Sequence, residues 1–371
     1  MQLKRIAVIT AVFCVTLSGF INLLHAVSAA PQAATLLYDS SLGSTPSGQS
    51  FSYLALNPQP PFTTQATQIY SAPVTILNTA NQLNDYAGYT VNQSAMPTLD
   101  RAAGFQLAFD LRLISENHSG NNDRAGFSVI LLDQDVYGIE MAFWENEIWV
   151  QEGNGGTPIF SHAEGVLYNS TNMLTSYKLT VISNTYLLAA NGTPLLSGNL
   201  RQYTSWEPPV GPLPDPYEQP NQLFLGDDTS SAGAEVWLGN VSIETNIAPM
   251  ISVAQTAVSL PEAITQTTFI INLNTPSPIT ATVQYKLVGG TAVANEDFVA
   301  NSGTLTFTPG SLSQNIQISL LPDALPEPDE TFSLQLFNGV NGVLGVDTAV
   351  FTIQDDDLPN YDLYLPLLTR P

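Results

Sequence analysis

Alternation of apolar and polar residues at every second position is the feature that most constrains how this chain folds. In GFQLAFDLRLI, the side chains of Phe105, Leu107, Phe109, Leu111 and Leu113 share one face, and mostly polar residues lie on the other. A period of two predicts a half-buried strand. Similar short runs recur along the chain, separated by Gly, Asn, Asp and Pro, and no long helical period follows the first thirty residues. The sequence therefore predicts an all-β protein.

Strand spacing and turn chemistry divide the 371 residues into two expected antiparallel sandwiches. Asn191 and Gly192 between two apolar runs predict a hairpin turn, because both residue types tolerate positive φ. Many short strands with such turns indicate a sandwich over residues 31–245. The stretch ETNIAPM then marks a boundary, and seven strands follow in about 110 residues, as an immunoglobulin-like sandwich requires. We therefore expect a second domain at residues 246–358.

The first thirty residues predict an export signal. Lys4 and Arg5 precede an apolar run over residues 6–24, and the following HAVSAAPQ resembles a signal-peptidase site near Ala29 or Ala30. An uncleaved membrane anchor is the alternative, because the run approaches the ~20 residues that span a bilayer. Cleavage is favoured by the small residues directly after the run. We expect a secreted or cell-surface protein with no membrane span once the signal is removed.

Charge and cysteine content narrow the classes of partner. The only cysteine, Cys14, lies in the signal, so the exported chain must be stabilised by core burial or by bound ions. Beyond the signal, 32 acidic residues face seven basic ones, which makes nucleic acid and anionic membranes poor partners. Solubility, salt tolerance and binding of multivalent cations all explain such acidity. The apolar tail at residues 359–371 predicts either a packed terminal strand or a sorting signal.

Acidic residues in the expected second domain gather in four segments. The domain has eleven of them and one basic residue, Lys286. The clustered acidic residues are Glu262, Asp297 in NEDF, Asp323, Glu327, Asp329 and Glu330 in PDALPEPDE, and Asp355, Asp356 and Asp357 after the last strand. Loops distant in sequence meet at one end of a Greek-key sandwich, where converging carboxylates repel unless protonated or neutralised. Because no histidine or cysteine is at hand, these oxygen ligands favour calcium, which takes 6–8 oxygens.

Five motifs in this region resemble, in order, the Calx-beta repeat named from sodium–calcium exchangers. They are VSLPEA, NLNTPSPITATVQYKLVGGTAVANEDFV, SGTLTFTPGSLSQNIQISLLPD, EPDETFSLQLFNG and FTIQDDD, within about residues 247–357. The resemblance implies an immunoglobulin-like sandwich that holds Ca²⁺ at its distal loops. The ligands that it implies are Glu262, Asp297, Asp323, Glu327, Asp355, Asp356 and Asp357, with Glu330 next to the site.

One loop departs from the calcium-sensing members of that family. They carry consecutive aspartates where this chain has Pro322, Asp323 and Ala324, so one family ligand is missing. We therefore expect one or two ions, bound weakly with Kd ~10⁻⁴–10⁻³ M, as in extracellular modules. Asp329, beside Pro328 in a turn, is expected to accept backbone hydrogen bonds and is not counted among the ligands.

Residues from about 35 to 245 resemble a concanavalin-type or laminin-G-like jelly roll of the kind found in secreted bacterial proteins. The resemblance rests on DRAGFSVILLDQDVYGIEMAFWENEIWVQE, YKLTVISNTYLLAANG and FLGDDTSSAGAEVWLGNVSIE. Such folds host lectins, adhesion modules and glycoside hydrolases, so the fold alone does not assign a function. A retaining glucanase of this type uses Glu-x-Asp-x-Glu, whereas this chain offers Glu140, Glu145 and Glu147. We expect Glu140 on a strand with one wet face, ENE in a hairpin turn, and no catalysis.

Aromatic side chains are the candidates for glycan contact. They are Trp144, Trp149, Trp206, Tyr203 and Tyr217, with Trp237 a weaker candidate. An aromatic residue in an alternating strand more often belongs to the core. The acidic pairs Asp133 and Asp135, and Asp227 and Asp228, lie in expected turns, where they either hold a further calcium or are solvated. The single histidines His118 and His162 are expected on the surface.

Together these patterns predict a secreted or cell-surface calcium-binding protein for adhesion or matrix binding, whose partner is an extracellular glycan or a matrix or cell-surface protein. A glycoside hydrolase with an accessory second domain is the alternative. A purely structural spacer is the third hypothesis. The sequence alone leaves the three open.

Overall fold

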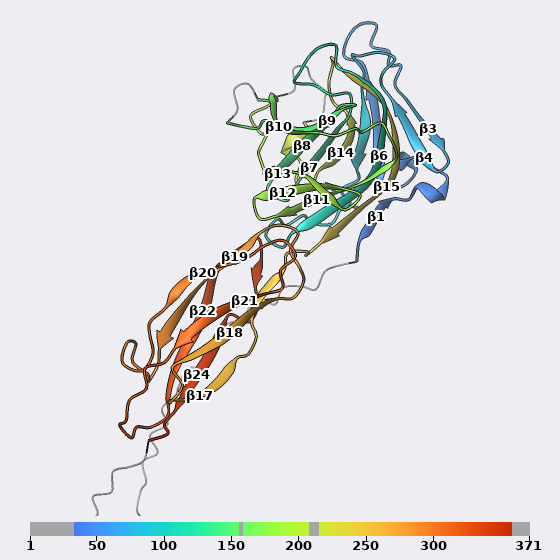
Figure 1. The fold of residues 1–371 in the computed structure, drawn as a ribbon. Coiled ribbons are helices and arrows are strands. Elements are labelled where there is room, and N and C mark those ends of the chain that lie inside the picture. Colours follow the sequence, from blue (N-terminus) through green and yellow to red (C-terminus); the bar gives the residue numbers. More distant parts are fainter. Residues whose placement is uncertain (1–32, 156–158, 208–214, 358–371) are drawn as a thin grey trace, which may run out of the picture.

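The strands of the protein form two β-sandwiches arranged end to end in a computed structural model, which describes residues 33–155, 159–207 and 215–357 (Figure 1). The expected signal at residues 1–30 and the tail at residues 359–371 lie outside the described residues. Strands β1 to β15 build the first sandwich and β16 to β24 build the second. Within the described residues, no helix is long and apolar enough to cross a membrane.

Two antiparallel sheets face each other in the first sandwich. The first sheet contains, in spatial order, β13 (Thr193–Asn199), β12 (Thr185–Ala190), β11 (Thr175–Ile182), β6 (Phe105–Asn117), β15 (Gly233–Thr245), β4 (Val74–Asn78) and β3 (Thr67–Ser71), and β1 (Thr35–Tyr38) pairs with β15. The second sheet contains β10 (His162–Leu167), β9 (Glu147–Gln151), β8 (Gly138–Phe143), β7 (Ser128–Leu132), β14 (Leu223–Asp227), β5 (Tyr86–Val91) and β2 (Phe51–Leu56). Three single-turn 3₁₀ helices connect strands: η1 (Ser40–Leu42), η2 (Pro46–Gly48) and η3 (Pro216–Glu218).

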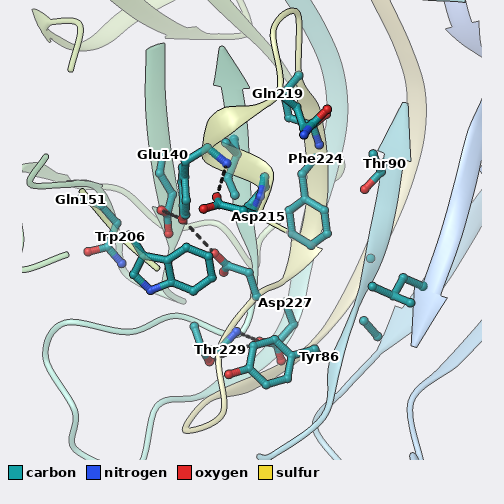
Figure 2. Close-up of a pocket in the computed structure, with 18 of the residues that line it drawn as sticks. Tyr86, Thr90, Glu140, Gln151, Trp206, Asp215, Gln219, Phe224, Asp227 and Thr229 are labelled. Carbon is teal, nitrogen blue, oxygen red and sulfur yellow. Dashed lines mark hydrogen bonds between the residues drawn. The ribbon is translucent and has the colours of Figure 1, made fainter. Parts of the chain in front are cut away.

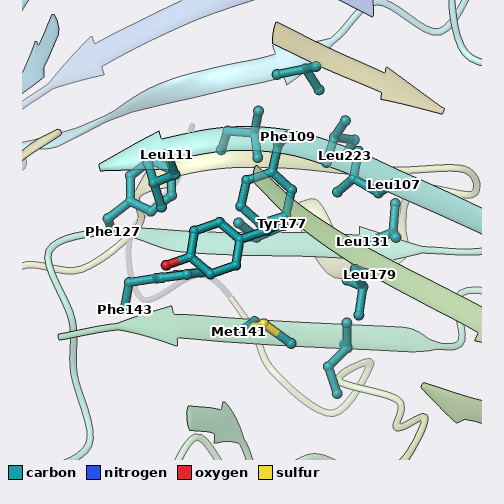
Figure 3. Close-up of a cluster of buried hydrophobic side chains, with 14 of the residues drawn as sticks. Leu107, Phe109, Leu111, Phe127, Leu131, Met141, Phe143, Tyr177, Leu179 and Leu223 are labelled. Carbon is teal, nitrogen blue, oxygen red and sulfur yellow. The ribbon is translucent and has the colours of Figure 1, made fainter. Parts of the chain in front are cut away.

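The core of the first sandwich lies between these sheets, as the period of two predicts. All five apolar residues of the face predicted on β6, from Phe105 to Leu113, are at most 1 % exposed. Phe109 stacks on Tyr177 of β11 with ring centroids 5.3 Å apart, and Phe143 of the opposite sheet meets both rings edge-on (Figure 3). Aromatic packing across the two sheets therefore fixes their separation.

The hairpin predicted at Asn191 and Gly192 joins β12 to β13. Both residues have positive φ, 49° and 81°, so the backbone twist of the turn matches that of the strands. This confirms the turn and its register.

The second sandwich also has two sheets, and it contains nine strands rather than the expected seven. One sheet orders β21 (Ser313–Ser319), β18 (Gln266–Leu273), β16 (Met250–Val253) and β23 (Val343–Leu344). The other orders β17 (Ala257–Pro261), β24 (Thr348–Gln354), β22 (Glu330–Val340), β19 (Ala281–Gly289) and β20 (Ser302–Phe307). The count differs because the run ISVAQTAVSL, expected as one strand, breaks into β16 and β17, which belong to different sheets, and because the two-residue β23 is too short for a pattern to predict.

Stacked aromatic rings also build the core of the second sandwich. Phe332 stacks on Phe298 with ring centroids 4.4 Å apart and on Phe351 with ring centroids 4.9 Å apart, and all three side chains are buried. Most pairings are antiparallel, but β16 pairs with β23 and β17 pairs with β24 in parallel. The parallel pair β17 and β24 matters for the site, because parallel strands end at the same edge of a sheet.

Replacing Phe109 tests whether the inter-sheet aromatic packing supports the first sandwich. Phe109→Ala should lower the free energy of unfolding by about 3–5 kcal/mol, because it leaves a cavity against Tyr177 and Phe143. Phe62, which is 68 % exposed, provides the matched control, and Phe62→Ala should change stability by less than about 1 kcal/mol. Urea unfolding followed by tryptophan fluorescence measures both; an equal loss in the two variants would contradict this account of the core.

Candidate functional site

The acidic segments meet at the end of the second sandwich that lies away from the first (Figure 1). Glu262 follows β17 and Asp355 follows β24, and their positions adjoin because Pro261 pairs with Gln354 in the parallel register. The Glu262 amide donates a 3.0 Å hydrogen bond to the Gln354 carbonyl. Asp297 lies between β19 and β20, and its carbonyl accepts from the Leu321 amide at 2.9 Å. The fold thus ties three separate loops together at this end.

Six carboxylates form two groups around one small crevice. Glu262, Asp355 and Asp357 make the first group, and Asp297, Glu327 and Glu330 make the second. Within each group, one oxygen of every residue lies within 4.8 Å of the others. Residues of both groups line the crevice: Glu262, Asp297, Glu327, Glu330 and Asp355. We call these six residues the acidic end.

Proximity raises several pKa values at the acidic end. Desolvation raises the pKa of Glu330 to about 7, and its hydrogen bond with Asp297 and the charges of Asp297, Glu327 and Glu262 add to the effect. Desolvation and the surrounding carboxylates also raise the pKa of Glu327 and of Asp357. A hydrogen bond from the Asp323 amide lowers the pKa of Glu262, but desolvation and three neighbouring aspartates outweigh it and raise that pKa overall. The acidic end therefore favours a proton or a cation in its midst.

Two of the seven ligands implied by the resemblance lie outside both groups, and one residue expected beside the site lies inside. The backbone amide of Asp323 donates a hydrogen bond to Glu262 Oε1 at 3.2 Å, and the Oδ1 atom of Asp323 accepts from the Leu325 amide at 2.7 Å. Asp356 is exposed to solvent, as the alternation of β24 continues and turns it away from its two neighbours. Glu330 is a full member of the second group. Asp329 accepts a hydrogen bond from the Asp355 amide at 3.3 Å, in line with the role expected for it.

The side chains at the acidic end fit a hard divalent cation. Asp355 Oδ1 and Asp357 Oδ2 are buried and have no hydrogen-bond partner in the described protein. A buried carboxylate oxygen without a donor is costly unless a cation or a proton compensates it. Six carboxylates supply enough oxygens for the 6–8 that calcium takes, with no nitrogen or sulfur ligand among them.

These features define an immunoglobulin-like sandwich with an acidic, cation-compatible end. Residues 244–357 match the Calx-beta domain family. In the same region the chain is 43 % identical over 79 residues to the sodium/calcium exchanger Calx of Drosophila melanogaster, a match that covers 21 % of this chain and 8 % of the exchanger. The second sandwich is a Calx-beta domain, and the aligned segment is a small part of its relative.

Several solved structures are similar to parts of this chain. The apo form of the Calx CBD1 domain matches with 32 % identity and a TM-score of 0.29, covering 29 % of this chain and 98 % of that domain. The exoplasmic/lumenal domain of VIP36, solved with Ca²⁺ and mannose, matches with 10 % identity and a TM-score of 0.34, covering 58 % of this chain and 91 % of that domain. A Bacillus subtilis protein with a galectin-like fold matches with 9 % identity and a TM-score of 0.33, covering 58 % of this chain and 98 % of that protein.

Glu140 lies in a cavity on the outer side of the second sheet of the first sandwich (Figure 2). It is 2 % exposed, and the Tyr217 hydroxyl donates a short hydrogen bond to its Oε2. The expected wet strand face is therefore wrong: segments between β13 and β14 cover it and leave a cavity of about 420 Å³. Desolvation, together with the charge of Asp228, raises the pKa of Glu140 well above its ordinary value. The residues ENE lie at the turn between β8 and β9, as predicted.

The aromatic candidates divide into core and cavity residues. Trp149 and Tyr203 are fully buried and Trp144 is 9 % exposed, so these three are not exposed platforms. Trp206, which is half-buried, and Tyr217 line the cavity. Trp237 is half-buried under the Arg112 guanidinium, which lies 5.1 Å from its ring centre.

The acidic pairs and the histidines are also more enclosed than the sequence predicts. Asp133 is fully buried in an ion pair with Arg101, which also lies 3.3 Å from Asp135, so one arginine offsets part of the charge of this pair. Asp227 ends strand β14 with no exposed surface. His118 stacks on Trp144 with ring centroids 4.3 Å apart, and His162 stacks on Trp149 at 4.2 Å. Both histidines are half-buried rather than on the open surface.

The cavity and its polar residue Gln151 were not predicted from the sequence, and Asp228 was expected in a turn rather than in a cavity. Gln151 closes β9 and Asp228 follows β14, and these strands are separated by β8 and β7 in the sheet. From the sequence alone, a polar residue at the end of a strand that faces a cavity cannot be distinguished from one that faces solvent. The one available signal was Glu140 itself, a carboxylate within the otherwise apolar run YGIEMAFW.

Without a cation, the acidic end should make the second sandwich less stable as the pH rises. Glu330 has a folded pKa near 7 against an ordinary 4.5, so its stabilising contribution is present below about 4.5 and is lost as the pH passes through 7. Calorimetry in excess chelator should give a higher Tm for the second sandwich at about pH 5 than at about pH 8. Glu330→Gln should shrink this difference, whereas the exposed Glu296→Gln should not. A Tm that rises with pH in chelator would contradict the assignment.

Proposed function

We propose that this chain is an exported, non-enzymatic protein of adhesion or of an extracellular matrix, in which calcium rigidifies the Calx-beta domain and the first sandwich binds a glycan. The partner is an extracellular glycan on a matrix or cell surface. The expected signal over residues 1–30 and the excess of acidic residues support export and argue against nucleic acid. The observation that carries the proposal is the acidic end, whose buried oxygens on Asp355 and Asp357 have no protein donor.

Calcium fits the acidic end because the carboxylates there are negatively charged and their oxygens lie close enough together to share an ion. The two groups of carboxylates would hold one ion each or share one, with Glu262, Asp355 and Asp357 on one side and the three residues around Asp297 on the other. The bound ion would supply positive charge that offsets the mutual repulsion of the carboxylates. The Calx-beta family supports this role, since one of its solved members is described as the calcium binding domain CBD12 of CALX1.1.

A rigid acidic end would connect calcium binding to the proposed role in adhesion or in a matrix. The acidic loops lie at the end of the second sandwich remote from the first, where the described chain also ends at Asp357 (Figure 1). An ion that joins these loops would stiffen the domain between the first sandwich and whatever follows residue 357. A stiff spacer holds a glycan-binding module at a fixed distance from its attachment.

Calcium should stabilise the second sandwich in the full chain. At a hundredfold excess of calcium over Kd, the gain is about 2.7 kcal/mol if only the native state binds. Asp355→Asn should abolish most of this gain, because it removes a member of the first group. Asp356→Asn is the matched control and should keep the gain, since Asp356 faces solvent. Differential scanning calorimetry with calcium and with chelator measures the shift; no shift in the unaltered chain would leave the acidic loops as solvated surface.

A glycoside hydrolase is the second candidate, because Glu140 and Asp228 lie close together in the cavity. The Tyr217 hydroxyl contacts both, at 3.4 Å from Asp228 Oδ2 and through its short hydrogen bond to Glu140. Paired carboxylates of this kind serve acid and nucleophile roles in glycosidases. We nevertheless favour binding, because both carboxyl groups contact the same buried tyrosine hydroxyl, that of Tyr217.

Hydrolysis is therefore expected to be absent. Incubation of the full chain with a panel of polysaccharides should release no new reducing ends over background. A release that disappears in Glu140→Gln would establish the hydrolase and overturn the non-enzymatic assignment. Retention on a glycan array without any release would support the binding module.

A further inference from the structure

The cavity of the first sandwich is lined by residues with buried hydrogen-bond acceptors that have no partner. Among the buried side-chain atoms without a hydrogen-bond partner, three belong to residues that line it: Gln151 Oε1, Asp227 Oδ2 and Asp228 Oδ1. Gln151 is 1 % exposed, and its amide nitrogen donates outward to the Asp123 carbonyl at 3.3 Å, which leaves the oxygen for the cavity. All three atoms are acceptors. A ligand that satisfies them must donate hydrogen bonds.

Charge at the cavity points to a cation. Glu140, Asp215, Asp227 and Asp228 line it, against one arginine, Arg124. The Arg124 guanidinium donates to two carbonyl oxygens, of Asp123 and Phe160, and makes no ion pair within 4.0 Å among those described. Burial raises the pKa of Glu140, Asp227 and Asp228, because it disfavours their charged forms. A positively charged ligand would stabilise those charged forms. The charge of Arg124 lowers the pKa of Glu140 and of Asp228 but does not outweigh their desolvation.

The aromatic and polar residues that line the cavity indicate what the rest of the ligand must be. Trp206, Phe224 and Tyr86 surround the carboxyl groups in Figure 2 and offer flat faces to a carbon skeleton or an ammonium group. The rest of the lining mixes apolar residues, among them Leu54, Val91 and Ile130, with amide and hydroxyl side chains, those of Thr90, Gln93, Gln219, Gln222 and Thr229. Such groups pair with several hydroxyls, which a simple alkylamine does not carry. The volume of about 420 Å³ suits a small polar molecule or one to two sugar rings.

We propose that this cavity binds an amino sugar in its protonated form, with the ammonium group at Glu140, Asp228 and Gln151 and a sugar ring against Trp206. An ammonium group has three donors and no acceptor, so it could donate to the unsatisfied oxygens of Gln151 and Asp228 and to the carboxyl of Glu140. This inference rests on the proposed glycan binding and names the class of glycan. It differs from the acidic end of the second sandwich, which offers no aromatic side chain to a ligand.

Titration calorimetry of the full chain tests the proposal in saturating calcium and near-physiological salt, so that the acidic end is occupied. Three probes are compared: a β-1,4-linked glucosamine oligomer, its fully N-acetylated counterpart, and the matching glucose oligomer. The glucosamine oligomer should bind at least about tenfold more tightly than the other two, the size of one charged hydrogen bond. Glu140→Gln should remove this preference. Glu218→Gln, an exposed change on η3 that removes the same charge outside the cavity, should leave it intact.

Other outcomes separate this inference from the proposed glycan binding. Equal affinity for all three oligomers, lost in Trp206→Ala, would overturn the amino-sugar assignment and keep the glycan site. Binding of cyclohexylamine as tight as that of glucosamine would overturn the sugar part. The glucosamine oligomer could also bind equally weakly to Glu140→Gln and Glu218→Gln. The preference would then come from the overall charge of the protein, and the assignment of the cavity as the binding site would be wrong. Circular dichroism of Glu140→Gln, an isosteric change, verifies that the variant is folded.

Discussion

Burial of one face of every strand between two sheets is the constraint on which the rest of this structure depends. In both sandwiches aromatic rings meet edge-on between the facing sheets, Phe109 with Phe143 in one and Phe269 with Phe351 in the other. Because the rings fix the separation of the sheets, the ends of the strands have fixed positions relative to one another, and so do the starts of the loops. The loops can then carry groups that would repel one another in a more flexible scaffold.

The acidic end is a direct product of that rigidity. Glu262 and Asp355 are neighbours because β17 and β24 run parallel in a fixed register, not because their side chains attract. The core holds the loops together despite the repulsion between carboxylates, which contributes to the raised pKa values of Glu262 and Glu330. A domain arranged in this way gains stability from any cation that enters, so ion binding and mechanical stiffness are coupled by the fold itself.

In the first sandwich the polar site lies on the outer face of a sheet, whereas in the second it lies on loops at one end. Segments between β13 and β14 cover part of that sheet with Tyr203 and Tyr217 and leave the carboxyl of Glu140 enclosed. A carboxyl group in that position costs folding energy that a simple structural role does not require. Its retention beside Gln151 and Asp228 is understandable if the cavity receives a donor-rich ligand.

Local alternation, turn chemistry and motif order were enough to predict the all-β class, the buried face of β6, the hairpin at Asn191 and the Calx-beta domain. They also predicted which acidic segments converge. Which oxygens come together could not be predicted, because side-chain direction depends on strand register and on the course of each loop: Glu330 joins the acidic end, Asp356 is exposed to solvent, and Asp323 contacts Glu262 through its amide. The cavity, too, was a tertiary outcome, since covering a sheet face depends on long loops whose sequence shows no periodicity.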